Sequence, residues 1–146
     1  MKNILYTSIL IFVGLISTAC ASKTTETPSF RDDLPYIPQA GDSEMQRDEI
    51  SIESSMVAST RSLPPQIMVR FTYFPPTACH QLRVEVSVPD AENKIYVSAY
   101  AVVEKDSACN LMALVTPLDE SLGLVSYPAG HYNLILNDTS IGEFDT

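Results

Sequence analysis

The chain has few basic residues, few glycines and few histidines, and each shortage excludes a class of function. Nine lysines and arginines stand against 18 aspartates and glutamates, giving a formal net charge of −9, so nucleic acid and anionic lipid are unfavourable partners. Five glycines form no phosphate-binding loop, and there is no Gly-x-Ser-x-Gly nucleophile elbow. His80 and His131 lack partners at zinc-site spacing. We expect no catalytic residue, metal site, cofactor or small-molecule substrate.

Long apolar stretches are equally scarce, which disfavours a permanent transmembrane helix. The longest, Ile4 to Ile16, is shorter than the ~20 residues that span a bilayer as a helix. It follows the early charge of Lys2 and precedes small residues at 17–19, which is the order of a cleaved secretion signal. Cys20 comes directly after them, where bacteria attach diacylglycerol to lipoproteins. We predict a signal peptide over 1–19 and lipidation of Cys20; simple secretion, with the signal cut at the same bond, is the alternative.

The stretch that follows Cys20 is acidic and rich in proline. Residues 26–49 hold more acidic than basic side chains and few large apolar residues. Such a composition cannot bury enough apolar surface to offset the entropy lost on ordering. We predict that residues 20–46 form the lipidated N-terminus and a flexible tether. The apolar segment from Leu34 to Pro38 allows another interpretation, a recruitment motif for a partner.

Beyond residue 46 apolar and polar residues alternate, which indicates half-buried β-strands. Prolines fall between the alternating runs or at their ends, where strands tolerate them. We predict one all-β domain over residues 47–146, a sandwich of two antiparallel sheets with about seven strands. The expected strands cover residues 49–57, 67–73, 82–88, 95–103, 111–118, 131–137 and 140–145.

Two of the alternating runs specify a hairpin register. Placing Val86 opposite Val97 makes every inward-facing pair apolar, as a half-buried sheet requires. The same register brings Arg83 opposite Tyr100 on the outer face. We expect these two side chains to touch, in a cation–π contact worth about 0.5–1 kcal/mol at an exposed site.

The odd number of cysteines also needs an explanation in an exported protein. If Cys20 carries lipid, Cys79 and Cys109 remain, one before the hairpin and one after it, at its open end. A disulfide between them closes a loop of about 30 residues and stabilises by about 3–4 kcal/mol on the loop-entropy model. The alternative is a reactive Cys79 with His80 as its base, although neighbours on an extended chain point to opposite sides.

The segment from Pro128 to Tyr132 is the most specific local pattern. Gly130 suits a position with positive φ. Tyr132 opens a strand and fits the tyrosine corner, in which the hydroxyl bonds back to the chain. Residues 137–140 then make the last turn.

The order of Cys79, hairpin, Cys109 and Pro-Ala-Gly-x-Tyr resembles the C-terminal immunoglobulin-like domain of uncharacterised bacterial secreted proteins and lipoproteins. The resemblance covers residues 48–146. It implies an immunoglobulin-like β-sandwich and offers no catalytic residues to carry over. Asp138 stands where those domains place the glycine of the final turn, which leaves the turn type open.

Together these features predict a non-enzymatic binding or interaction domain, exported and lipid-anchored to the bacterial cell envelope, with a protein or a glycan as its partner. The candidate contact surface is the outer face with Tyr96 and Tyr100, or the loop that begins with Tyr73 and Phe74, because tyrosines are enriched at contact surfaces. The alternatives are a soluble secreted protein, an accessory subunit of an envelope complex, and a hydrolase whose cleft the sequence does not reveal.

Overall fold

The computed structural model describes residues 34–62, 65–107, 116–124 and 126–146. The predicted signal peptide, Cys20, Cys109 and the first part of the tether lie outside the described residues. Within the described ranges no helix is long and apolar enough to cross a bilayer. The elements are the 3-10 helix η1 (Ala40–Glu44) and the strands β1 (Gln46–Glu49), β2 (Ser51–Ser59), β3 (Ile67–Phe74), β4 (Gln81–Val86), β5 (Lys94–Val103), β6 (Leu118–Gly123), β7 (His131–Leu136) and β8 (Thr139–Asp145).

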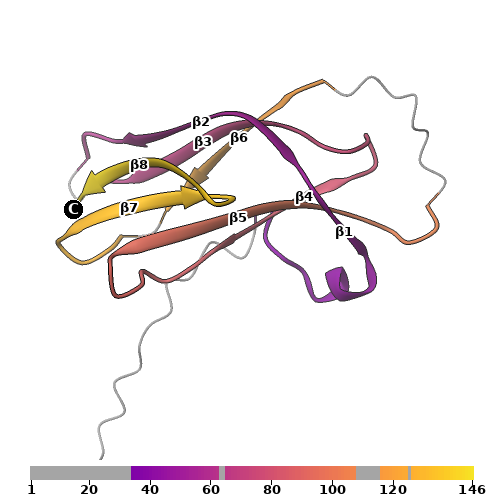
Figure 1. Cartoon of the computed structure of the whole chain (residues 1–146), viewed down its shortest axis with the longest axis horizontal. Helices are drawn as coiled ribbons and strands as arrows, with labels where there is room; N and C mark the ends of the chain where they lie inside the picture. Colours follow the sequence, from indigo (N-terminus) through magenta and orange to yellow (C-terminus); the bar gives the residue numbers. More distant parts are fainter. Residues whose placement is uncertain (1–33, 63–64, 108–115, 125) are drawn as a thin grey trace, which may run out of the picture.

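These strands form two packed sheets, which confirms the predicted all-β sandwich (Figure 1). One sheet is built around β5, which pairs with β1, β4 and β7, while β8 pairs with β7; the other has the order β2-β3-β6. The pairing of β5 with β7 is parallel, which departs from the all-antiparallel prediction. The single strand expected at 49–57 is two strands, because the chain leaves the first sheet at the buried Ile50 and enters the second as β2.

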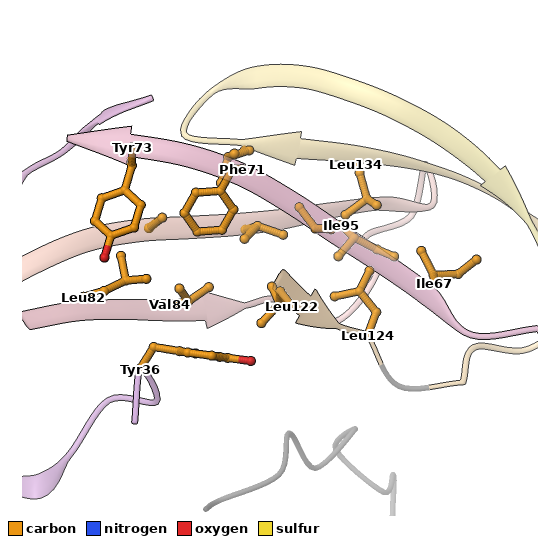
Figure 2. Close-up of a cluster of buried hydrophobic side chains, with 14 of the residues drawn as sticks. Tyr36, Ile67, Phe71, Tyr73, Leu82, Val84, Ile95, Leu122, Leu124 and Leu134 are labelled. Atoms are coloured by element: carbon orange, nitrogen blue, oxygen red, sulfur yellow. The ribbon is translucent and has the colours of Figure 1, made fainter. Parts of the chain in front are cut away.

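The core lies between the sheets and takes alternate residues from strands such as β3, β5 and β7. The hairpin register is as predicted, with Val86 opposite Val97 and Arg83 opposite Tyr100. Figure 2 shows side chains of β3 lying above those of β4, with β6 contributing beside them. The strands β3, β4, β5 and β6 contribute these buried apolar residues to the core: Ile67, Val69, Phe71, Tyr73, Leu82, Val84, Ile95, Val97, Ala99, Ala101 and Leu122.

Residues 34–45, here called the strap, are part of the domain. The carbonyl of Tyr36 accepts a hydrogen bond from the Val84 N–H at 2.7 Å, so the strap covers the edge of β4. The Tyr36 side chain is only 6% exposed and belongs to the core (Figure 2). The prediction of a flexible tether up to residue 46 is therefore wrong for residues 34–45. The apolar residues around Tyr36 are buried against the edge of β4. Because this edge is covered, it cannot pair with a strand of another chain.

Arg83 lies beneath the strap and is 1% exposed. Its Nε and Nη2 donate to the two carboxylate oxygens of Asp42 at 2.7 and 3.1 Å. Nη1 donates to the carbonyls of Leu82 at 2.9 Å and Pro35 at 3.3 Å, and Nη2 also donates to Gln81 Oε1 at 3.0 Å. These bonds satisfy all five guanidinium N–H groups. The hydrogen bond from Arg83 lowers the pKa of Asp42.

Tyr132 makes the backward hydrogen bond that defines a tyrosine corner, since its hydroxyl donates to the carbonyl of Pro128 at 3.0 Å. Its ring stacks on Phe144 with centroids 5.3 Å apart. Gly130 has no positive φ, contrary to expectation. A Cβ at this position would lie 3.3 Å from the ring of Tyr132, so a larger residue would require that ring to shift by a few tenths of an ångström.

The last turn, between β7 and β8, has Asn137 and Asp138 as its two central residues. Both have positive φ, 42° and 67°. Positive φ at both central residues is typical of a type I′ turn, which most often carries Asn-Gly. Asp138 therefore occupies a backbone conformation that glycine adopts without strain.

Candidate binding groove

A groove opens on the outer face of the five-stranded sheet because two strands share one edge of β5. The strand β7 pairs with residues 94–97 of β5, and β1 pairs with residues 100–103. Figure 1 shows β7 and β1 over opposite ends of β5. The two strands diverge between these stretches and leave a hollow of about 670 Å³. Its lining includes Arg47, Asp48, Glu49, Tyr96, Ser98, Tyr100, Ile135, Asn137 and Asp138.

Alternate residues of β5 form the floor of the groove. Tyr96, Ser98 and Tyr100 point to the same side of the strand, because side chains alternate between the faces of a sheet. Tyr96 is 40% exposed, whereas Tyr100 is only 7% exposed. Ile135 of β7 lies beside Tyr96 in the parallel register. The groove therefore has one open aromatic ring on its floor and a second ring that is covered.

The ring of Tyr100 is covered by Arg47 of β1. The guanidinium carbon of Arg47 lies 3.5 Å from the ring centroid. The prediction that Arg83 makes the cation–π contact with Tyr100 is wrong. The strap covers the side chain of Arg83, and Asp42 binds its guanidinium. The hydroxyl of Tyr100 donates to Glu85 Oε1 at 2.6 Å. Burial first, and then this bond to Glu85, raise the pKa of Tyr100 to about 12.

Asn137 closes the gap that β1 and β7 leave on the edge of β5. Its side-chain oxygen accepts a hydrogen bond from the N–H of Ala99 at 2.8 Å, and its amide donates to the carbonyl of Ala99 at 2.8 Å. Its own backbone N–H donates to the carbonyl of Val97. The side chain of Asn137 thus makes the two hydrogen bonds to Ala99 that a neighbouring strand would otherwise make. The sequence gives no sign of this role, because an asparagine in a two-residue turn is already explained by its positive φ.

The walls carry charges of both signs. Glu49 on β1 and Asp138 in the last turn are exposed, and within the described ranges neither side chain has a hydrogen-bond or ion-pair partner. Arg47 lies 3.9 Å from the carboxylate of Glu85, which is beyond hydrogen-bond distance. Asp48 is engaged, since hydrogen bonds from Gln46 first and from His80 lower its pKa. Arg47, Glu49 and Asp138 are therefore the charged groups that remain available in the groove.

The side chain of His80 is held by hydrogen bonds on both ring nitrogens. Its Nε2 lies 2.9 Å from Asp48 Oδ2, and its Nδ1 lies 2.8 Å from the hydroxyl of Thr77. The Thr77 N–H also donates to Nδ1, so Nδ1 acts as an acceptor and Nε2 carries the proton that Asp48 accepts. The hydroxyl of Thr77 also accepts from the N–H of Cys79. Thr77 is buried, and neither it nor His80 lines the groove. This cluster fastens β1 to the turn before β4.

The two alternative contact surfaces predicted from the sequence differ in the structure. The structure brings Tyr96 and Tyr100 together in the groove. Tyr73 instead points into the core with 6% exposure, and Phe74 next to it is half-buried. Cys79 lies in the turn before β4, and Cys109 lies outside the described residues, so their pairing stays a prediction. In the described part of the chain, no three His, Cys, Asp or Glu side chains gather where they could hold a metal ion.

Comparison with known proteins agrees with this architecture. The model of the ORF11 beta-sandwich domain family matches residues 69–146, which run from within β3 to the end of β8. No curated protein and no solved structure matches the chain. The family match covers more than half of the sequence and describes the same all-β sandwich that the strands build. The chain belongs to the ORF11 beta-sandwich domain family.

Proposed function

We propose that this protein is exported and anchored by lipid on Cys20 to the bacterial cell envelope, where its sandwich acts as a binding domain. The observation that carries the binding role is the groove over β5, because it is concave, holds an exposed aromatic ring and carries two carboxylates, Glu49 and Asp138, that have no partner among the described residues. A concave site that combines an exposed aromatic ring with a few convergent polar groups is typical of ligand sites. The anchoring part of the proposal rests on the signal pattern of residues 1–19 and the position of Cys20.

We also propose that Cys79 and Cys109 form the disulfide of the exported domain. If Cys20 carries lipid, Cys79 and Cys109 are the two cysteines that remain, and they lie before and after the hairpin at its open end. Disulfides persist in oxidising compartments outside the cytoplasm, which agrees with export.

Fractionation of cells that express the full chain tests the anchoring. We expect the wild-type protein in the membrane fraction and Cys20→Ala in the periplasm or the medium. Cys109→Ala is the matched control, because it removes a cysteine without touching the lipidation site and should stay with the membrane. Equal distribution of the wild type and Cys20→Ala would contradict the anchoring.

A further inference from the structure

We propose that the groove over β5 binds an uncharged carbohydrate chain, with the ring of Tyr96 as its stacking platform. The inference deepens the binding role proposed above by naming the ligand class. It rests on three features of the groove: the exposed ring on its floor, polar groups of both hydrogen-bonding kinds on its walls, and charges that disfavour other ligands.

The floor fits the apolar face of a sugar ring. The side chain of Tyr96 is 40% exposed, and Ile135 on the neighbouring strand β7 extends the apolar surface beside it. Aromatic rings combine a large apolar face with a fixed geometry, so they bind flat apolar surfaces at low entropic cost. The C–H groups on one face of a pyranose are such a surface. Tyr100 is not available for this contact, because Arg47 already covers it.

The walls fit the rim of hydroxyl groups. On the walls, the carboxylates of Glu49 and Asp138 only accept hydrogen bonds and the guanidinium of Arg47 only donates them, while on the floor the hydroxyl of Ser98 does both. A sugar hydroxyl both donates and accepts hydrogen bonds, so it can form a hydrogen bond with each of these side chains. The stacking of Arg47 on Tyr100 holds its N–H groups in place, and in the described structure none of them is used in a hydrogen bond.

The charges argue against the competing ligands. An anionic polymer would meet Glu49, Asp138 and a net charge of −9, which repel it. The carboxylates would attract a basic peptide, but the positive charge of Arg47 would repel it. Arg47 also already makes the cation–π contact with Tyr100 that a lysine or arginine of the peptide would otherwise make. An uncharged ligand with many hydroxyls meets neither obstacle.

Calorimetric titration of the full chain in detergent tests the proposal. The probes are linear glucose, mannose and N-acetylglucosamine hexamers, with a lysine-rich peptide as the competing ligand class. We expect one of the sugars to bind with an affinity that changes less than twofold between low and high salt, because the ligand carries no charge. Peptide binding that weakens with salt, or no sugar binding up to millimolar concentration, would overturn the proposal.

Variants of the floor separate the groove from other surfaces. Tyr96→Ala should weaken sugar binding at least tenfold, whereas Tyr96→Phe keeps the ring and should stay within twofold. Met56→Ala, an exposed residue of the other sheet, should leave binding unchanged. Binding is compared at a temperature at which circular dichroism shows all three variants to be folded, so that a weaker affinity reports the loss of the ring and not unfolding. Equal binding by Tyr96→Ala and the wild type would overturn the proposal. Loss of sugar binding leaves the fractionation of Cys20→Ala unaffected, so the two proposals fail independently.

Discussion

Replacing Asp42 by asparagine should destabilise the domain more than any exposed substitution. Asparagine keeps the shape of the side chain but removes the charge that compensates Arg83. The guanidinium would then be left 1% exposed and without an ionic partner. Breaking a buried ion pair by removing one partner costs about 3–5 kcal/mol. The side chain of Asp42 is 10% exposed, so some water reaches the pair and we expect the lower end, about 3 kcal/mol.

This loss is large compared with the stability of a domain, which is about 5–15 kcal/mol in total. Urea unfolding followed by circular dichroism would show it as a midpoint shift of about 1.5–2 M, for a slope near 1.5–2 kcal/mol/M. Glu92→Gln is the matched control, because Glu92 pairs with Lys94 on the surface and exposed pairs contribute little. We expect no measurable shift for that variant.

A second variant distinguishes the ion pair from simple loss of the strap. Arg83→Met removes the buried charge, so adding Asp42→Asn to it should cost much less than Asp42→Asn costs in the wild type. The reasoning would be refuted if Asp42→Asn shifts unfolding by less than 1 kcal/mol, or if the two substitutions are additive.

Further predictions concern pH, the tyrosine corner and the last turn. The pKa of Asp42 is below its ordinary value of 3.8, so its contribution is complete above 3.8 and is lost as the pH falls through the lowered pKa; acid titration of unfolding should show a smaller loss for Asp42→Asn. Tyr132→Phe removes the bond to Pro128 and should cost about 1 kcal/mol in urea unfolding. Tyr127→Phe removes a buried hydroxyl without a partner in the described residues and should be neutral or stabilise by up to about 1 kcal/mol, so a loss would contradict the assignment. Asp138→Gly relieves a positive φ and should raise stability by about 1 kcal/mol, measured as a higher melting temperature.

The sequence predicted the sandwich and the hairpin register because both depend on a local pattern. Period-two alternation defines an apolar face, and only one register of Val86 and Val97 keeps that face inside. Tyr132 was identified for a similar reason, since its partner Pro128 lies four residues away.

The strap and the groove could not be predicted, because each depends on contacts between distant segments. Arg83 alternates like an exposed residue, and only the strap turns its position into a buried one. The groove needs β1 and β7 to share an edge of β5, and Asn137 to fill the gap between them. No pattern in the sequence predicts that these two strands share one edge of β5.

The most direct test of the account is the intact mass of the full protein extracted from membranes, with Cys20→Ala beside it. We predict a chain that begins at Cys20 and carries the added mass of a diacylglyceryl group, with the remaining two cysteines joined to each other. A chain with a free thiol at Cys20, or one in which Cys20 is crosslinked to Cys79 or Cys109, would contradict the account.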